Sequence, residues 1–352
     1  MEGVLTMSNH QSLNDSLQLS ILDLATIYNG ESVTQTLQNT TELVQLADRL
    51  GYTRYWFAEH HNTKYQISTS PDLLSAHAAA VSKNIRVGAG GIMLPNHSPL
   101  KVAENFSILE GLHPNRIDLG IGRAPGTDGL TALALRRSSE TVGTDDFPEQ
   151  LSELLAYFSR DFPTDHPFKD ISASPDPTLI PDIYMLGSSN GGMQFAIQRG
   201  LGFVFAAHIS PHLAVPVLRT YRENFKPSSF MSEPKSILAI IVITAESEEE
   251  ANYLAGPAEL QWVRWGTGAF NLPPPTLEEA EAYVYTPQEE AIRQENKGRF
   301  IIGSVENVEY RLKKLAAEAM VDEIMILNML TEKSTRHKSY ELLADAFNLT
   351  SQ

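Results

Sequence analysis

Short apolar runs alternate with helix-like segments along nearly the whole chain, and this alternation restricts the possible folds more than any other feature. From Leu17 onward, eight apolar runs can be recognised, most of them followed by a segment with helical periodicity. The runs are apolar at successive positions, which is typical of parallel strands covered by helices on both faces. Eight such units are the number in a closed barrel, so we predict an α/β fold, a (β/α)8 TIM barrel, as a single domain over residues 17–352.

The apolar runs and the turn residues that bound them define the predicted strands. These strands are Leu17–Asp23, Thr53–Glu59, Ile85–Leu94, Asn115–Ile121, Pro181–Gly187, Phe203–Ala207, Ser236–Thr244 and Val321–Leu327. A long loop is predicted between the fourth strand and the amphipathic helix around Pro148–Phe158.

Two segments are expected to lie outside the barrel. Residues 1–16 are polar, lack the basic start and apolar core of a signal peptide, and are predicted to be a flexible tail. Residues Gly256–Phe300 form a long insertion before the eighth strand and contain two of the three tryptophans. We interpret this insertion as a lid or a substrate-binding wall, and a dimer contact or a mobile loop is the alternative.

An open, doubly wound sheet is the competing fold. That fold requires a glycine-rich phosphate loop that directly follows a strand and opens a helix. The nearest match is Gly120–Gly126, but Pro125 and the Gly-Thr-Asp-Gly sequence after it disfavour a helix at that point. The barrel is therefore the preferred interpretation.

Composition excludes several classes of function. The net charge of −16 disfavours binding to nucleic acid or to an anionic membrane surface, because both carry negative charge. The chain has no cysteine, so disulfides, thiolate catalysis and cysteine-bound metals are excluded. No segment reaches the roughly 20 apolar residues of a membrane helix. A cytoplasmic location is expected from these features.

The sequence Ala58-Glu59-His60-His61-Asn62 follows the second strand and raises the possibility of a metal site. Neighbouring side chains of an extended strand point to opposite faces, so Ala58 and His60 share one face while Glu59 and His61 share the other. Adjacent histidines therefore do not chelate one metal readily, and we predict no metal site. His60, at the catalytic end of a barrel strand, could serve as a general base or hydrogen-bond donor, or it could cap the next loop.

Glycines and polar residues gather at the ends of the third, fourth and fifth strands. The glycines in Gly88–Leu94 favour close approach of a flat ligand, although a bulge is the alternative. Arg123 is suited to bind a phosphate or a carboxylate, or to pair with a nearby aspartate. The serines and glycines of Leu186–Gly192 precede a helix, where they could hold a phosphate or simply cap the helix.

Taken together, several stretches resemble the bacterial luciferase-like flavin-dependent monooxygenases. These stretches occur in the order of that family and span nearly the whole chain; they are Ala58–Asn62, Arg86–Gly126, Tyr184–Ala206, Gly303–Ala316 and Val321–Leu327. The resemblance implies a TIM barrel that binds FMN in its reduced form, supplied by a separate flavin reductase, and that acts on a small-molecule substrate. It also implies a homodimer.

The resemblance further implies roles for individual residues. His60 is expected to lie at the flavin and aid catalysis, and the other implied residues bind the cofactor: Ala25, Gly90, Gly91, Gly122, Arg123, Ser188, Ser189, Gly191 and Gly192. A non-proline cis peptide beneath the flavin ring corresponds to Gly90–Gly91. The luciferase itself has a cysteine where this chain has Gly122, so light emission and long-chain aldehydes are not implied.

Three other functions remain as alternatives. A deazaflavin-dependent oxidoreductase could transfer hydride on the same barrel, and a non-catalytic flavoprotein could keep the barrel and the flavin site. A metal-dependent hydrolase would need ligand spacing that the histidines do not have. An FMN-dependent monooxygenase is the function that we predict.

Overall fold

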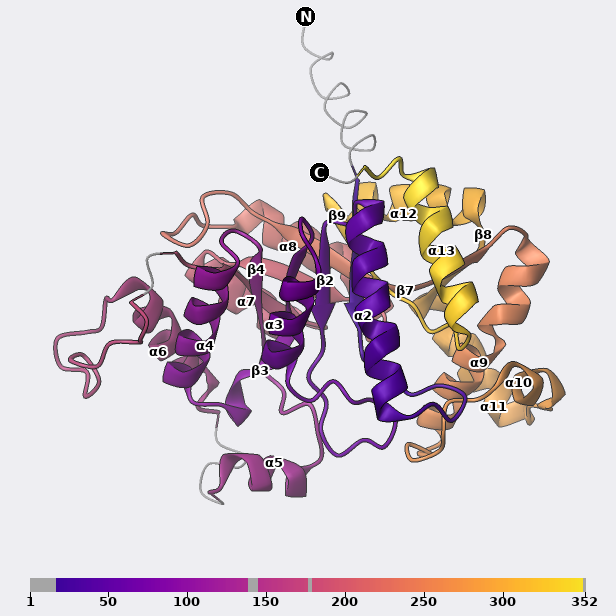
Figure 1. The fold of residues 1–352 in the computed structure, drawn as a ribbon, viewed down its shortest axis with the longest axis horizontal. Helices are drawn as coiled ribbons and strands as arrows, with labels where there is room; N and C mark the ends of the chain where they lie inside the picture. The colour runs from indigo at the N-terminus through magenta and orange to yellow at the C-terminus, as the bar shows by residue number, and fades with distance from the viewer. Residues whose placement is uncertain (1–16, 139–144, 177–178, 351–352) are drawn as a thin grey trace, which may run out of the picture.

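The predicted barrel strands close into a parallel barrel in the computed structural model, which describes residues 17–138, 145–176 and 179–350 (Figure 1). The predicted tail, residues 1–16, lies outside the described residues. The barrel strands are β1 (Gln18–Asp23), β2 (Arg54–Phe57), β3 (Arg86–Met93), β4 (Ile117–Gly122), β5 (Asp182–Gly187), β6 (Gly202–Ala206), β7 (Ser236–Ala245) and β9 (Glu323–Leu327). β9 closes the ring because it pairs in parallel with both β1 and β7.

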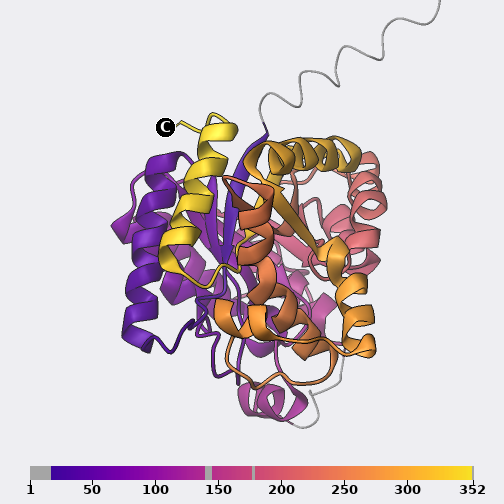
Figure 2. The ribbon, with the colours of Figure 1, turned by 90° about the vertical axis from the view of Figure 1, so that its right-hand side faces the viewer.

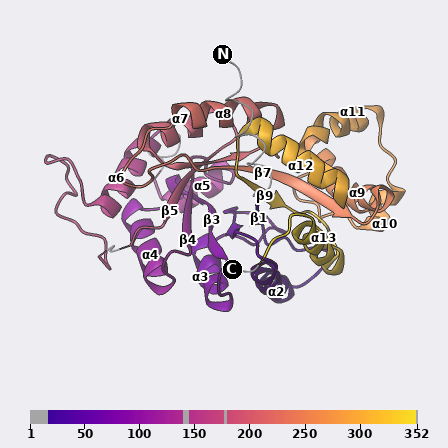
Figure 3. The same cartoon turned by 90° about the horizontal axis from the view of Figure 1, so that it is seen from above.

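Most of the helices surround this barrel, as the view from above shows, and a few lie at one of its ends (Figures 1 and 3). They are α2 (Val33–Leu50), α3 (Pro71–Val81), α4 (Pro99–Leu112), α5 (Gly129–Arg136), α6 (Phe147–Ser159), α7 (Asn190–Arg199), α8 (Ala214–Asn224), α9 (Glu248–Gly266), α10 (Leu277–Ala282), α11 (Pro287–Asn296), α12 (Val305–Ala319) and α13 (Lys333–Ala346). Among the described helices, none has the length and apolar character needed to cross a membrane.

The structure differs from the sequence-based prediction in two places. The predicted loop after the fourth strand contains α5, which begins because the Asp128 side chain accepts hydrogen bonds from the backbone N–H groups of Leu130 and Thr131. A ninth strand, β8 (Phe300–Ser304), also lies before β9. β8 pairs only with the C-terminal part of β7, so it lengthens the sheet without entering the ring.

The predicted insertion is largely helical. Its first residues, 256–266, continue α9, and α10 and α11 follow before the chain enters β8. Figures 1 and 2 show α5, α10 and α11 at the same end of the molecule, which is the end where the barrel strands have their C-termini. This placement directs the insertion toward the catalytic face of a TIM barrel.

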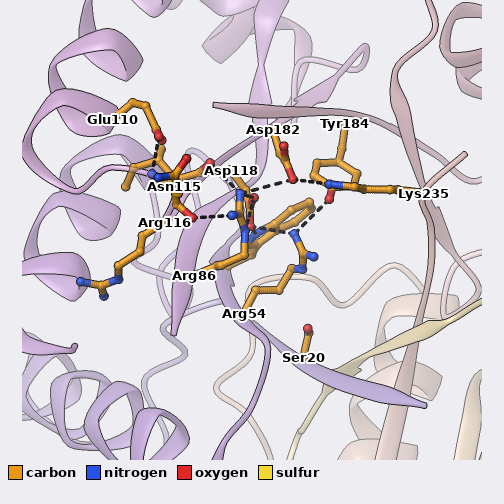
Figure 4. Close-up of polar contacts among 12 residues, drawn as sticks. Ser20, Arg54, Arg86, Glu110, Asn115, Arg116, Asp118, Asp182, Tyr184 and Lys235 are labelled. Carbon is orange, nitrogen blue, oxygen red and sulfur yellow. Dashed lines mark hydrogen bonds and ion pairs between the residues drawn. The ribbon is translucent and has the colours of Figure 1, made fainter. Parts of the chain in front are cut away.

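A buried network of charged side chains fills the N-terminal end of the barrel interior (Figure 4). Arg54 donates to Glu323 through Nε (2.7 Å) and Nη2 (3.0 Å), and to Asp118 through Nη1 (2.9 Å). Glu323 also accepts a hydrogen bond from Ser20, and Asp118 accepts one from Trp56 Nε1 at 2.9 Å. Because Arg54 is only 6% exposed, its charge is stable there only with both carboxylates in place.

We expect Arg54→Met to reduce the free energy of unfolding by about 3–5 kcal/mol, because it leaves the buried carboxylate of Glu323 without a cation and that of Asp118 with Arg86 alone. The measurement is urea-induced unfolding followed by circular dichroism. Lys314→Met is the control, because Lys314 forms an exposed ion pair with Glu318 at 3.9 Å and such pairs contribute at most about 1 kcal/mol. Equal losses for the two variants would contradict the structural role of Arg54.

Candidate functional site

Two adjoining cavities open at the C-terminal ends of the barrel strands. The first, which we call the glycine cavity, has a volume of about 250 Å³ and is lined by the ends of β3, β4 and β5 together with neighbouring strands. The second, which we call the aromatic cavity, has a volume of about 330 Å³ and is lined by loops and by residues of α9 and of the 270–275 segment. His60, His208 and Ile209 line both cavities, so these three residues mark their junction.

Most of the predicted site residues meet at the glycine cavity. Its lining includes His60, Gly90, Gly122, Arg123, Ser188, Ser189 and Gly192. Gly91 and Gly191 are adjacent in sequence to lining residues but do not line the cavity themselves. Ala25 lines neither cavity, although its neighbours Leu24 and Thr26 line the aromatic cavity. Ala25 is therefore the one predicted residue that the structure places apart from the others.

Close packing explains why residue 90, in β3, is a glycine. A Cβ atom on Gly90 would stand 2.9 Å from Cε3 of Trp56, whose side chain is fully buried in the barrel. The peptide bond between Gly90 and Gly91 is cis, as expected. The absence of a side chain at Gly90 leaves backbone exposed to the cavity, and a flat ligand can approach such a surface closely.

Arg123 and the N-terminus of α7 form a positively charged seat. Ser189 caps α7 by accepting a hydrogen bond from the N–H of Gly191. The Arg123 guanidinium lies beside the same glycine, since a Cβ atom there would be 2.9 Å from Nη1. Within the described ranges, no hydrogen bond or ion pair joins Arg123 to another side chain. This arrangement can bind an anion through a cation and helix N–H groups together.

His60 occupies the junction of the two cavities with an unsatisfied nitrogen. Its backbone N–H donates to the carbonyl oxygen of Ser68 at 3.0 Å, which fixes the position of the residue. Its Nδ1 atom is buried and forms no hydrogen bond to described residues. Burial lowers the pKa of the imidazole, so His60 is neutral near pH 7 and can donate or accept one hydrogen bond.

Glu59 points away from the cavities, and its buried carboxylate organises the loop after β3. As the strand parity predicts, Ala58 and His60 line the glycine cavity while Glu59 and His61 lie on the other side, joined at 2.8 Å. Glu59 lies in the loop that follows β2, but its side chain is fully buried, at 0% exposure. Its carboxylate also accepts from the Met93 N–H at 2.9 Å and contacts His97 Nε2 at 2.9 Å.

These contacts shift two pKa values in opposite directions. Burial alone would raise the pKa of the Glu59 carboxyl, but the hydrogen bonds from His97, His61 and Met93 outweigh it and lower that pKa. Burial alone would lower the pKa of His97, yet its hydrogen bond to Glu59 and the charge of that carboxylate raise it. Glu59 and His97 therefore stabilise each other as an ion pair beneath the cavity.

His208 is a site residue that sequence reasoning missed. Its Nδ1 lies 3.2 Å from the carbonyl oxygen of Ala239, and that carbonyl can only accept, so Nδ1 carries the proton. Burial lowers the pKa of His208 to about 4, so the ring is neutral in the physiological range. Its position after β6 was the only sequence signal, and one histidine at a strand end is weak evidence without a neighbour such as His60.

Arg299 connects the predicted insertion to this junction. Its guanidinium donates to the carbonyl oxygens of His208, at 2.7 Å, and Ile209. The same guanidinium lies over the Trp262 ring, 4.6 Å from its centroid. The insertion supplies much of the wall of the aromatic cavity, including Trp262, Trp265 and Phe270. Its role as a movable lid stays a prediction.

The described residues contain no group of three histidine, aspartate or glutamate side chains placed to hold a metal ion. The Glu59 carboxylate is hydrogen-bonded to both His61 and His97.

This chain is similar to known proteins in both sequence and fold. The model of a family described as "Luciferase-like monooxygenase" matches residues 17–326. The uncharacterized protein YceB of Bacillus subtilis is 41% identical over 94% of this chain and 99% of its own length. An N-acetyl-S-alkylcysteine monooxygenase of the same organism is 33% identical over 94% of this chain and 98% of its own. The crystal structure of apo-MsnO8 superposes with a TM-score of 0.86 at 34% identity, covering 96% of this chain and 100% of that one.

We expect Glu59→Gln to lower the pKa of His97, because burial would then act without the opposing carboxylate. An NMR titration of the histidine Cε1–H signals measures this change, with the distant His337 as internal control. A histidine whose pKa is raised by folding stabilises the folded protein at pH values below its unfolded-state pKa. This contribution to the free energy of unfolding is lost as the pH rises through the folded-state pKa. The free energy of unfolding of the wild type should therefore fall as the pH rises above the ordinary pKa range of histidine, and that of the variant should not. An unchanged His97 pKa would contradict the assigned pair.

Proposed function

Because the chain belongs to the luciferase-like monooxygenase family and is by that membership a flavin-dependent monooxygenase, we propose that it uses reduced FMN and O2 to oxidise a small organic substrate. The choice of FMN rests on the position of the Arg123 guanidinium, which lies beside the N-terminus of α7 at one end of the glycine cavity. A phosphate group is the ligand that such a seat fits best.

The residues of the glycine cavity fit a flavin. The backbone at Gly90 offers a surface without a side chain, against which an isoalloxazine ring could lie. The phosphate would be held by Arg123, by the hydroxyl groups of Ser188 and Ser189 and by the N–H groups at the start of α7. The buried Nδ1 of His60 has no partner among the described residues, which suits a group that meets its partner only when ligands are bound.

Bound reduced FMN would supply the electrons that activate O2, and the protein would orient the reactants and exclude water. His60 can hold or transfer a proton at Nδ1, since burial keeps its ring neutral near pH 7. His208 presents its Nε2 as a hydrogen-bond acceptor, because Nδ1 is engaged by Ala239. The aromatic wall from α9 and the 270–275 segment covers the second cavity, where the organic substrate would bind.

Further features of the proposal rest on the family relationship. We propose that a separate flavin reductase supplies the reduced FMN and that the enzyme acts as a homodimer in the cytoplasm. The name of the B. subtilis N-acetyl-S-alkylcysteine monooxygenase makes small thioethers a reasonable first set of substrates. Chemically or photochemically reduced FMN should replace the reductase if its only role is to deliver the cofactor.

We expect Arg123→Ala to weaken FMN binding by roughly ten- to a hundredfold, because a charge-assisted contact to the phosphate is lost. Binding of riboflavin, which lacks the phosphate, should change little. Equilibrium titration of both flavins measures the difference, and Arg219→Ala, on the exposed side of α8, is the control for net charge. Equal losses for FMN and riboflavin would refute the phosphate role. Failure of the wild type to bind FMN, with binding of a deazaflavin instead, would replace the cofactor assignment.

We expect His60→Ala to lower the rate of substrate oxidation by about a hundredfold while FMN affinity stays within a few-fold of wild type. The reason is that the imidazole lies at the junction of the cavities and away from the phosphate seat. Product formation per reduced FMN consumed is the measurement, and His212→Ala, an exposed histidine, is the control. Undiminished turnover in His60→Ala would exclude a catalytic role.

A further inference from the structure

We propose that the aromatic cavity selects a substrate with an apolar body and one anionic group, and that Lys64 recognises the anion. This inference rests on the proposed function, since it specifies what the second cavity binds beside the flavin. The starting observation is that each cavity is lined by one lysine or arginine and by no carboxylate among the described residues: Arg123 in the glycine cavity and Lys64 in the aromatic cavity. A lysine that is the one cation lining a cavity without carboxylates favours an anionic group on the ligand.

Lys64 is held at the mouth of the cavity by an ordered loop. Thr26 and Gln66 form an antiparallel bridge, and the N–H of Ile27 donates to the carbonyl oxygen of Tyr65 at 2.7 Å. The hydroxyl of Thr63 donates to the carbonyl oxygen of Gln66 at 2.6 Å, which closes the turn around the lysine. The backbone that carries Lys64 is thus fixed on both sides, and only the side chain needs to be ordered when a ligand binds.

The Lys64 ammonium has no competing carboxylate in the described structure. No ion pair joins Lys64 to any described aspartate or glutamate, and no acidic side chain lines the cavity. A chain with a net charge of −16 repels anions at long range, so an anionic substrate requires a local cation to bind. A cationic substrate would meet Lys64 with no compensating charge, which makes that class unfavourable.

The rest of the cavity favours an apolar body. Trp262 and Trp265 pack edge to face with ring centroids 5.2 Å apart, and Phe270 and Leu272 continue the wall. These side chains gain most from an aromatic or aliphatic group of the ligand. Because Lys64 is exposed at the mouth while His60 lies at the junction, an anion on Lys64 directs the apolar body toward the glycine cavity.

The test compares a carboxylate with its neutral isostere. Binding of 3-phenylpropanoate and of 3-phenylpropanamide is measured by the fluorescence of the tryptophans, two of which line the cavity, with and without FMN. We expect the wild type to prefer the carboxylate by about three- to tenfold, and the preference to shrink as salt is added. Lys64→Gln should abolish the preference without altering amide binding, and Lys64→Arg should keep it.

Lys83→Gln is the matched control, because it changes the net charge equally but lies before β3, at the opposite end of the barrel. It should leave the preference intact. Equal affinity for the two probes in the wild type, a preference that survives in Lys64→Gln, or failure of both probes to bind would each overturn the proposal. If the wild type binds no FMN but still shows the Lys64-dependent preference for the carboxylate, the proposed function is overturned and this inference stands.

Discussion

The buried guanidinium of Arg54 joins three strands at the N-terminal end of the barrel. It joins β2 to β9 through Glu323 and to β4 through Asp118, so it links strands that are not all neighbours in the ring. Burying these charges is costly, and the cost is offset only by complete pairing within the network. Polar groups therefore fill the N-terminal end of the barrel, whereas the two cavities open at its C-terminal end.

Glycines at the C-terminal end of the barrel allow close packing around the cavities. A Cβ atom on Gly90 would clash with Trp56, and one on Gly122 would clash with Met93. The two cavities carry little charge and meet at His60 and His208, both of which burial keeps neutral. Arg299 then attaches the segment that covers the second cavity to the backbone at His208. The glycine cavity, the two histidines and the segment that covers the aromatic cavity are thus connected through one junction.

The sequence was sufficient to predict the eight barrel strands, because long apolar runs bounded by turn residues leave few alternatives. The sequence also predicted that His60, Arg123 and Ser188 lie at one end of the barrel, because all three follow barrel strands and the C-terminal ends of these strands converge. In the structure, all three line the glycine cavity. β8 was missed because its apolar run ends after three residues, at Ile302, where Gly303 and Ser304 follow. The burial of Glu59 was missed because its partners are distant in sequence: Met93 ends β3, and His97 follows in the turn after it. His208 was missed because its importance depends on a neighbour distant in sequence.

We propose that the glycine cavity holds FMN with its phosphate between Arg123 and the N-terminus of α7. A crystal structure of the FMN-loaded protein would show where the phosphate binds. We expect phosphate oxygens within hydrogen-bond distance of the Arg123 guanidinium and of the N–H groups that begin α7, with the ring against Gly90 and beside His60. Flavin bound elsewhere, or with its phosphate turned away from Arg123, would contradict it.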